Sequence, residues 1–283
     1  MTNTIWQKKF SIGELYYVNE LETRSLIYEI FYQNNYLQDY LTLTPGAVIF
    51  DVGANIGIFS LFAMQYCNNK AEIYSFEPIP LTFSCLQKNL RRFGNKIHLY
   101  KTGISHVAKA CDVDFTLFGN NFATATYKPQ DKIISNYQPL LNYNTLLAMS
   151  SLTNKKLYYQ LRFLPFLRNY LIAGHYKRQT TPTLIKGRLI SLGNFIEENQ
   201  IRHIDLLKID VEGCEADVIK SIKPHQFTNI KQLSIEVHDI KNRVARLTSY
   251  LKGHGYIIRV QRNPFLENLG FNHHMVYAKR DEK

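Results

Sequence analysis

The sequence has no long hydrophobic run and no organised set of cysteines. No apolar stretch approaches the roughly 20 residues that a membrane-spanning helix needs, and the N-terminal residues MTNTIWQKKF contain no apolar signal core. These absences argue against a helical membrane protein and predict a cytoplasmic chain. The four cysteines, Cys67, Cys85, Cys111 and Cys214, have no paired spacing, which argues against a disulfide framework or a zinc site and predicts buried thiols.

Acidic residues are scarce relative to basic ones. The 283 residues include 34 Lys and Arg against 23 Asp and Glu, a net charge of +11. Such a field attracts nucleic acid, anionic membrane or an acidic protein, and charge alone does not choose among them. Basic residues gather modestly between Lys155 and Arg188, where a solvated helix face is the simplest alternative. Apolar residues make up 45% of the chain, which argues against disorder.

Short apolar runs alternate with helical patterns along most of the chain. AVIF (47–50), AEIYSF and IHLYKTGI predict strands, and the segments between them predict helices. Farther along, we expect RLISLGNFIEENQ to be helical, IDLLKID and QLSIEV to be strands, and YIIRVQ and FNHHMVYAKR to close the sheet as a hairpin. Strands that alternate with helices form a parallel sheet. The predicted fold class is therefore α/β, a Rossmann-like, doubly wound and mostly parallel sheet with a C-terminal antiparallel hairpin.

The alternation of strands and helices breaks between about residues 118 and 185, and this break divides the chain. Its length suits one core with an elaboration, so we expect a single domain over residues 1–283. Its parts are an N-terminal helical cap (1–45), a cofactor-binding half (46–117), an insertion that forms a lid, with a helix interrupted by Pro165 (118–185), and a second half that carries the catalytic strand ends (186–283).

The string DVGANIG, residues 51–57, stands between the first strand and its helix. Such a turn presents free backbone amides and the positive end of the helix dipole to a ligand. Dinucleotide-binding turns read G-x-G-x-x-G, but Asn55 stands at the middle glycine and would crowd a pyrophosphate. Asp51 would also repel a pyrophosphate, yet it can pair with the ammonium of an amino acid. The turn therefore predicts S-adenosylmethionine as cofactor.

A second acid completes the predicted cofactor site. Glu77 follows Gly57 by 20 residues, in SFEP at the end of the second strand, where a carboxylate accepts both ribose hydroxyls of NAD or S-adenosylmethionine alike. The alternative is a strand–turn–helix with chance glycines, which the joint placement of these residues disfavours. The predicted cofactor-binding residues are Asp51, Gly53, Ala54, Asn55, Gly57, Glu77, Pro78 and Asp210.

Four strings carry a family resemblance. VIFDVGANIGIFSLFA, YSFEPIPLTFSCLQKNL, IDLLKIDVEGCEADVIKSI and SIEVHD resemble the FkbM family of S-adenosylmethionine-dependent methyltransferases, over roughly residues 46–105 and 187–278. The opening IGELYYVNELETRSLIYEIF is similar to FkbM-type O-methyltransferase domains associated with polyketide synthase and nonribosomal peptide synthetase assembly lines. The resemblance implies a class I methyltransferase that methylates a hydroxyl of a polyketide or peptide intermediate.

The fourth and fifth strands end in ionisable residues, at the edge where open parallel sheets bind ligands. Lys208 and Asp210 share one face of their strand, and the simplest alternative is that Lys208 only neutralises Asp210. Glu236 and His238 share a face of the next strand. An imidazole there suits removal of the acceptor's proton, with Glu236 or Glu212 orienting its ring. The predicted catalytic residues are His238, Glu236, Glu212 and Asp210, against the alternative of a structural surface role for His238.

A metal is a further alternative at these strand ends. Asp210, Glu236 and His238 could hold Mg²⁺ through hard oxygen ligands. Histidine is a poor magnesium ligand and no second carboxylate directly follows Asp210, so no metal is predicted. His273 and His274, in the closing hairpin, are further candidates to line the site.

Other functions stay open as alternatives. Methylation of a saccharide or lipid headgroup is one. RNA binding or RNA methylation fits the +11 charge and the Tyr- and Arg-rich insertion, but KIDVEG stands where enzymes for base amines carry an N-P-P-Y-like tetrapeptide. Asn55 and Asp51 disfavour a NAD-dependent dehydrogenase. The expected partner is a small-molecule substrate that an acidic acyl carrier protein can present to a basic surface of Lys155, Lys156, Arg162, Arg168, Lys177 and Arg178.

Overall fold

A computed structural model gives the fold and describes residues 4–119, 122–133, 137–262, 267–268 and 270–280. The strands and helices along the chain are β1 (Trp6–Phe10), β2 (Gly13–Tyr17), α1 (Glu20–Ile27), β3 (Val48–Val52), α2 (Ile58–Tyr66), β4 (Glu72–Phe76), α3 (Pro80–Leu90), β5 (Ile97–Tyr100), β6 (Gly103–Ile104), β7 (Cys111–Phe118), α4 (Pro129–Lys132), α5 (Tyr143–Thr153), α6 (Lys155–Phe163), α7 (Arg168–Thr180), β8 (Pro182–Ile190), α8 (Leu192–Glu198), β9 (Leu206–Ile209), α9 (Glu215–Lys220), β10 (Gln232–His238), α10 (Arg243–Gly253), β11 (Tyr256–Arg262) and β12 (His273–Arg280). Shorter helical turns are π-helical at Tyr28–Tyr32 and 3₁₀ at Arg91–Lys96, Phe122–Thr124, Gln138–Leu141, Pro165–Leu167 and Pro224–Asn229.

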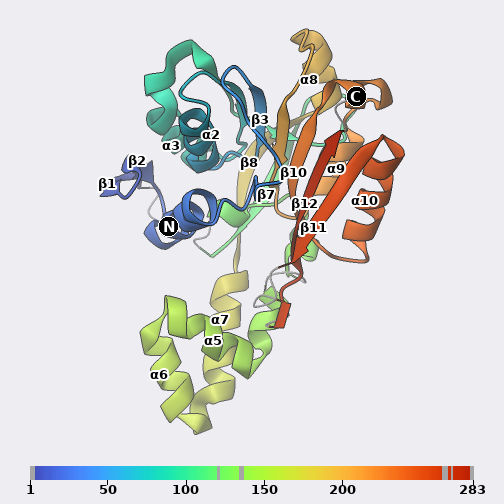
Figure 1. The fold of residues 1–283 in the computed structure, drawn as a ribbon. Coiled ribbons are helices and arrows are strands. Elements are labelled where there is room, and N and C mark those ends of the chain that lie inside the picture. The colour runs from blue at the N-terminus through green and yellow to red at the C-terminus, as the bar shows by residue number, and fades with distance from the viewer. Residues whose placement is uncertain (1–3, 120–121, 134–136, 263–266, 269, 281–283) are drawn as a thin grey trace.

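The central element is a seven-stranded sheet in the order β11-β12-β10-β9-β3-β4-β5 (Figure 1). Strands β10, β9, β3, β4 and β5 are paired in parallel, and β12 runs antiparallel to both of its neighbours. The chain winds outward from β3 in both directions. The predicted class, a doubly wound Rossmann-like α/β sheet with a closing antiparallel hairpin, is confirmed.

Helices cover both faces of this sheet (Figure 1). The core on one face includes α2, α3 and the N-terminal segment, and the core on the other includes α8, α9 and α10. All four residues of β9, LLKI, are buried, as a central strand requires. The carboxyl ends of β3, β4, β9 and β10 lie along one edge, where ligands of such sheets bind.

The N-terminal segment begins with a strand pair that the sequence did not predict. β1 and β2 form an antiparallel hairpin, and α1 with its π-helical extension follows. Four of the five residues of β1 are exposed, so this strand lacks the alternation that identifies a half-buried strand. Of the described part of the expected helical cap (1–45), Glu20–Tyr32 is helical, and Asn19 caps α1 by accepting hydrogen bonds from the N–H groups of Leu21 and Glu22. The segment is therefore a hairpin and a helix together.

A three-stranded sheet in the order β6-β8-β7 follows β5. β8 is PTLIKGRLI, so the prediction that RLI begins a helix is wrong, and the helix starts at Leu192. Most positions of β8 alternate between exposed and half-buried, a period of two that is typical of a strand. The division of the whole chain into one domain with a lid stays a prediction.

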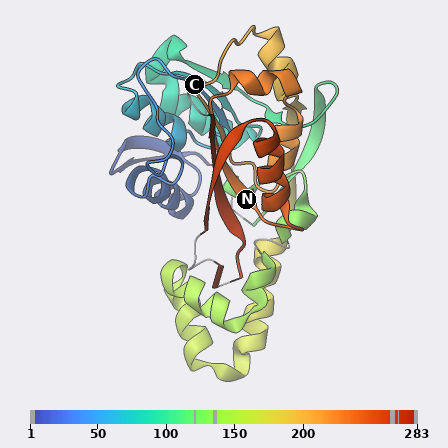
Figure 2. The same ribbon diagram turned by 45° about the vertical axis from the view of Figure 1, so that its right-hand side comes forward.

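Between β7 and β8 the chain forms helices that project from the body (Figures 1 and 2). We call residues 137–180, which include α5, α6 and α7, the helical knob. The predicted interruption at Pro165 is present, because α6 ends at Phe163 and α7 begins at Arg168.

The structure also bears on the cysteines and on membrane-spanning helices. Cys67, Cys85 and Cys214 are buried, but Cys111 is exposed at the start of β7, which corrects the expectation for that thiol. In the part of the chain that the structure describes, no helix combines the length and the apolar character that crossing a membrane requires.

Candidate active site

The turn after β3 is shaped by two glycines. Gly53 has a φ of 82°, and a Cβ there would lie 1.8 Å from the backbone oxygen of Asp210, so a side chain would collide with the chain after β9. Gly57 has a φ of 93°, and a Cβ there would lie 2.8 Å from Leu86. Between them, Asn55 has a φ of 50°, in the left-handed region that Asn tolerates. These residues bring the turn close to the chain that follows β9.

The backbone N–H groups of this turn are engaged within the chain, unlike the expected free amides. Those of Gly53 and Ala54 donate to the carbonyl of Phe76, and that of Gly57 donates to Ala54. The N–H of Ile56 donates to the side chain of Asn55 at 2.6 Å. The turn therefore offers a ligand its tight shape and its neighbouring carboxylates, and the expectation of free donors is corrected.

Glu77, at the end of β4, ties the turn to the neighbouring strand. Its carboxylate accepts hydrogen bonds from the N–H groups of Asn55 and Ile79, each at 2.9 Å, and from the hydroxyl of Thr82 at 2.8 Å. Burial raises the pKa of Glu77 to about 7, against the lowering effect of these donors. Its remaining lone pairs can accept hydroxyl groups of a ligand, as predicted for a ribose.

Lys208, on β9, is a buried cation under the turn. Its ammonium donates to the carbonyl oxygen of Gly53 at 2.8 Å and lies 3.1 Å from Asp51 Oδ1 and 3.7 Å from Asp210 Oδ2. Burial works to lower the pKa of Lys208, but the two carboxylates outweigh it and the pKa is raised. These contacts agree with the alternative in which Lys208 neutralises Asp210.

Asp51 lies in a different place from the one expected. Its side chain is fully buried, where it accepts a hydrogen bond from the hydroxyl of Ser60 at 2.7 Å and pairs with Lys208. Alternation along β3 turns it toward α2, which carries Ser60. Its ammonium partner belongs to the protein itself, which corrects the expectation of a direct pair with a ligand.

Two carboxylates meet at the ends of β9 and β10. The hydroxyl of Tyr36 donates to Asp210 at 2.8 Å and lies 3.5 Å from Glu236. Enclosure by the protein raises the pKa of Asp210, against the lowering effect of Lys208. Enclosure and the charge of Asp210 raise the pKa of Glu236 well above its ordinary range. A cation beside these groups would favour their ionised forms.

His238, the last residue of β10, is buried between two glutamates. Its Nε2 lies 2.9 Å from Glu212 Oε2, and its Nδ1 lies 3.2 Å from Glu215 Oε1. The other oxygen of Glu215 is 3.2 Å from Arg243, which donates to Asp131 at 2.7 Å. A line of alternating charges therefore runs from α4 through α10 and α9 to the imidazole. These contacts place His238 in the interior, where the alternative of a surface histidine does not apply.

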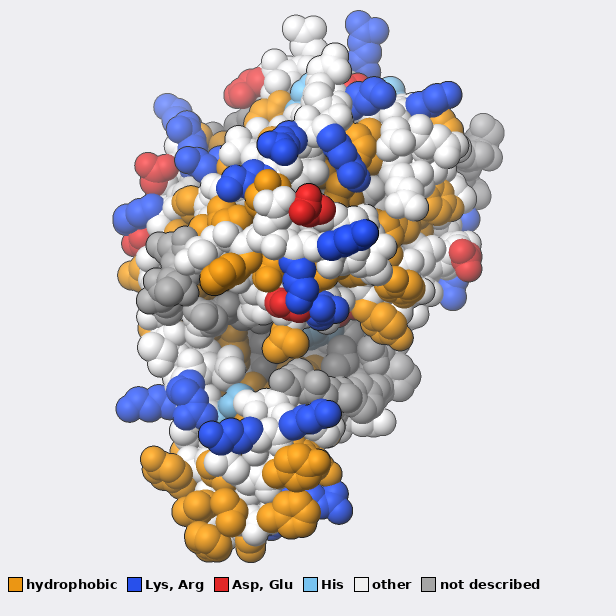
Figure 3. Space-filling model, turned by 90° about the vertical axis from the view of Figure 1, so that its left-hand side faces the viewer, with side chains coloured by type: hydrophobic (Ala, Val, Ile, Leu, Met, Phe, Trp, Pro, Cys, Tyr) orange, Lys and Arg blue, Asp and Glu red, His pale blue; other side chains and the backbone are white. Residues whose placement is uncertain are grey.

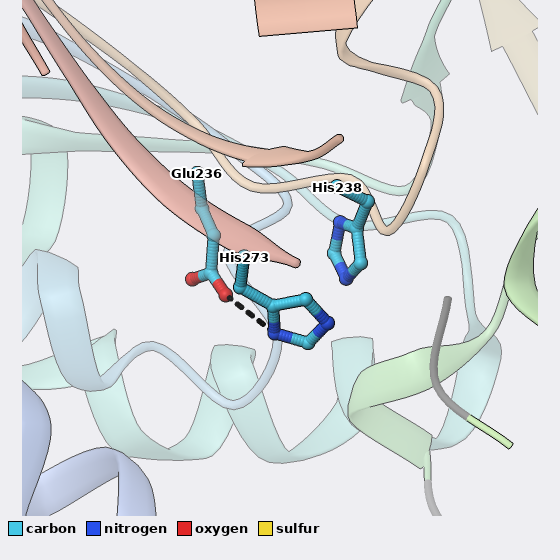
Figure 4. A group of neighbouring side chains, drawn as sticks. All are labelled: Glu236, His238 and His273. Atoms are coloured by element: carbon cyan, nitrogen blue, oxygen red, sulfur yellow. Dashed lines mark ion pairs between the residues drawn. The ribbon is translucent and has the colours of Figure 1, made fainter. Parts of the chain in front are cut away.

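His273 adds a second imidazole beside Glu236. Its Nδ1 lies 3.9 Å from Glu236 Oε1, and its ring centre lies 4.3 Å from that of His238 (Figure 4). One ligand atom from each of Glu236, His238 and His273 lies within 4.8 Å of the others. Two imidazoles and a carboxylate suit transition metals better than Mg²⁺. The group that could hold a metal therefore contains His273 where the sequence suggested Asp210.

One cavity connects the turn, Glu77 and the strand ends. Of the described residues, neither Asp51, Gly57 nor His238 lines it; His238 meets the cavity-lining Glu212. The remaining predicted residues all line the cavity: Gly53, Ala54, Asn55, Glu77, Pro78, Asp210, Glu212 and Glu236. Other walls come from the N-terminal segment, β7, the chain before α4, and β8, and include Ile30, Tyr36, Phe115, Tyr127 and Leu189.

Several contacts of this site have no local sequence signal. Tyr36 is 174 positions from its partner Asp210. Arg243 reaches Glu215 only because α10 packs beside α9 in the fold. Glu215 itself follows KIDVEGC directly, so an extension of that string would have found it.

Comparisons with known proteins give a consistent result. The sequence profile of the Methyltransferase FkbM domain matches residues 51–258. The chain is 28% identical over 274 residues to the 31-O-demethyl-FK506 methyltransferase FkbM of Streptomyces tacrolimicus, which covers 93% of this chain and 92% of that protein. It is 27% identical over 273 residues to the AMB antimetabolite synthetase AmbE of Pseudomonas aeruginosa, of which it spans 12%. The crystal structure of a methyltransferase FkbM from Methylobacillus flagellatus has a TM-score of 0.53 at 16% identity, over 87% of this chain and 47% of that one, a likeness in fold.

Proposed function

Because the chain belongs to the family of the Methyltransferase FkbM domain, we propose that it transfers a methyl group from S-adenosylmethionine to a hydroxyl oxygen of a polyketide or peptide intermediate. One observation carries the proposal. A single cavity unites the glycine turn after β3, Glu77 at the end of β4 and the carboxylates that follow β9 and lie on β10. The first two suit a cofactor and the last suit an acceptor.

The charges of the cavity fit a cationic cofactor. S-adenosylmethionine carries a sulfonium and an ammonium group, and when bound it supplies a methyl group activated for transfer. Burial is the main cause of the raised pKa values of Asp210 and Glu236, and Lys208 offsets it only in part at Asp210, so a cationic group in the cavity would stabilise their ionised forms. Asp210 would hold the ammonium and Glu77 the ribose hydroxyls.

On the acceptor side, Glu212 connects the cavity to His238. Glu212 lines the cavity, and its Oε2 lies 2.9 Å from Nε2 of His238. An acceptor hydroxyl must lose its proton as the new bond forms. We assign this proton to Nε2 of His238, which takes it by way of the Glu212 carboxylate, while Glu236 lies on the same face of β10 and orients the acceptor. The Glu215 carboxylate at Nδ1 then stabilises the imidazolium.

Arg243 and Asp131 are positioning residues for this imidazole. Arg243 holds Glu215 beside Nδ1, and Asp131 holds Arg243 from the other side. Asp131 lies on α4, in the helical region between β7 and β8. The placement of that region is therefore coupled to the orientation of the proposed base.

Relatives support a natural-product substrate. One is a methyltransferase of 31-O-demethyl-FK506 and another is an antimetabolite synthetase. For this chain we propose a small-molecule intermediate that an acidic acyl carrier protein presents. Lys177 and Arg178 are exposed near the end of α7, where the helical knob joins β8, and would meet the carrier there.

Methyl-labelled S-adenosylmethionine tests the function directly. The purified chain would be incubated in parallel with carrier-bound β-hydroxyacyl groups, the same acyl groups on a small soluble thiol, free sugars and total RNA. We expect label in the acyl arms, in an ether that survives mild base. Label found only in sugar or only in RNA would mean that this molecule, and not an acyl intermediate, is the acceptor. Calorimetry that shows no binding of S-adenosylmethionine would overturn the function itself.

A further inference from the structure

The helical knob has a small core of its own. Leu146, Leu157 and Leu161 are buried together, with partly buried side chains of α5 and α7 packed against them. Within the described residues, this cluster shares no member with the cores on either face of the central sheet. Figures 1 and 2 show the knob standing away from the body. Its outer surface is therefore not used to cover the sheet.

Large aromatic side chains gather at the far end of the knob, where α6 passes into α7. Phe166 is 79% exposed, Tyr170 77%, Phe163 65% and Tyr159 56%. Tyr159 and Phe163, four residues apart on α6, stack with their ring centres 6.2 Å apart. Figure 3 shows hydrophobic side chains covering this end of the molecule. An exposed apolar patch of this kind marks an interaction surface.

The charge of this region has one sign. The sequence contains no Asp or Glu from Lys132 to Ile196. The knob itself carries six basic residues, Lys155, Lys156, Arg162, Arg168, Lys177 and Arg178. An anionic surface would therefore meet no acidic group on the knob.

Two pairs of basic residues, at the start of α6 and at the end of α7, lie away from the aromatic end. Lys155 and Lys156 begin α6, and Lys177 and Arg178 lie in the last turn of α7. At a rise of 1.5 Å per residue, these pairs lie about 10 to 15 Å along their helices from the turn that joins α6 to α7. Figure 3 shows Lys and Arg side chains between the body and the hydrophobic end, and another beside the hydrophobic end itself.

We propose that the knob docks on an anionic lipid surface. The aromatic end enters the headgroup region, and Lys155 and Lys156 at the start of α6 face the lipid phosphates. Lys177 and Arg178 lie farther back, beside β8, where the proposed carrier would dock. Interfacial elements bury their apolar side about 5 to 10 Å deep, and Lys155 and Lys156 lie just behind that depth, about 10 to 12 Å from the turn. Basic residues alone would also suit an acidic protein. The four protruding aromatic side chains on a convex end favour lipid, because a fluid surface accepts them without a matching hollow. This inference extends beyond methyl transfer and does not depend on it.

Vesicle sedimentation with the full chain tests the proposal. We expect binding to phosphatidylcholine vesicles that contain phosphatidylserine, and binding about tenfold or more weaker to phosphatidylcholine alone or in high salt. Phe163→Ser with Phe166→Ser and Tyr170→Ser should lower binding to the anionic vesicles about tenfold or more. Tyr28→Ser with Tyr32→Ser is the matched control, since these side chains are exposed on the N-terminal segment; it should leave binding unchanged.

Fluorescence gives a second readout of insertion. Trp6 is the single tryptophan, so Trp6→Phe with Phe166→Trp places the sole indole at the far end of the knob. Its emission should shift to the blue on anionic vesicles, whereas that of Trp6→Phe with Tyr32→Trp should not. Absence of vesicle binding overturns the proposal, and so does binding that survives loss of the three aromatic side chains. Binding of an acidic carrier protein without vesicle binding, lost in the triple variant, would assign the knob to a protein partner and also overturn it.

Discussion

The cavity and the helical knob place charge in opposite ways. At the cavity, Asp210 and Glu236 are enclosed, and the buried Lys208 balances only part of their charge. On the knob, basic side chains stand at the surface, and the sequence provides no acid within the region. Enclosed charges must be balanced by neighbours or by a bound ligand, whereas surface charges are screened by solvent and cost little without a partner. The cavity therefore selects what binds inside it, and the knob selects what approaches from outside.

In the cavity, we expect the largest loss of activity from replacing His238, the proposed proton acceptor. His238→Ala is expected to lower kcat by roughly 10² to 10⁴ and to leave cofactor affinity near its original value, because the ring contacts Glu212 and Glu215 and not the cofactor turn. Single-turnover kinetics and calorimetry separate the two quantities. Full turnover in His238→Ala would refute the assignment. Activity that survives EDTA favours the base over a metal held by Glu236, His238 and His273.

Lys208 tests how far the enclosed charges depend on one another. Lys208→Met removes the cation that pairs with the fully buried Asp51. Loss of one partner of a buried pair costs about 3 to 5 kcal/mol, so the free energy of unfolding should fall by about that amount. Asp51→Asn added to Lys208→Met should recover part of the loss, since the unpaired charge is gone. Urea denaturation measures both, and an unchanged midpoint in Lys208→Met would contradict the argument.

Residues at strand ends were predictable from the sequence, because one local rule places them. Glu77 and Asp210 each follow the last apolar residue of a strand, Glu236 lies two positions before the end of β10, and parallel strands bring such ends to one edge. All three line the cavity. Their partners were not predictable in this way. Tyr36 meets Asp210 across 174 positions, a contact that depends on the whole fold.

The missed strands share a physical cause. β1 exposes four of its five residues, and most of β8 is exposed or half-buried. Hydrophobic periodicity reports burial, so a strand with little buried surface gives a weak signal. Asp51 shows the converse limit: its position at the end of β3 was evident, but its direction toward Ser60 and Lys208 depended on packing against α2.

Glu77 tests the cofactor end of the cavity. Glu77→Ala should remove charge-assisted hydrogen bonds to the ribose worth about 1.5 to 3 kcal/mol, which weakens binding on the order of tenfold to a hundredfold. Calorimetry measures this affinity, and NAD should not bind in the same assay. An unchanged affinity for S-adenosylmethionine would leave Glu77 only its structural contacts with Asn55, Ile79 and Thr82.

The titration of Glu77 predicts a pH dependence. Burial raises its pKa from 4.5 to about 7, so the carboxyl is mostly protonated at pH 6 and mostly ionised at pH 8. The carboxylate accepts hydroxyl donors more strongly, so cofactor affinity should rise by up to about tenfold across this window. Stability changes in the opposite sense: between about pH 4.5 and 7 the folded state keeps a proton that the unfolded chain has lost, so this group's contribution falls as pH rises.

Two matched variants isolate this effect. Glu77→Gln should flatten the dependence of affinity on pH. Glu22→Gln should preserve it, because the pKa of Glu22 is also raised to about 7 by burial, but Glu22 is not among the described residues that line the cavity. A pH profile that flattens in Glu22→Gln and persists in Glu77→Gln would assign the pH dependence to Glu22 and not to Glu77. Asn55 contacts both glutamates.

The smallest expected effect lies on the knob side of the comparison, where charges are exposed and screened. Lys177→Glu with Arg178→Glu should raise the apparent KM for a carrier-bound substrate several-fold and spare a soluble mimic of the same acyl group, because only the carrier needs docking. Arg246→Glu with Lys252→Glu, on the exposed side of α10, makes the same change in net charge away from the knob and should alter neither substrate. An equal loss on both substrates would mean that the region shapes the cavity and does not dock a carrier. Tight RNA binding by the unmodified chain, abolished by the same reversal at Lys177 and Arg178, would move the assignment of this surface to nucleic acid.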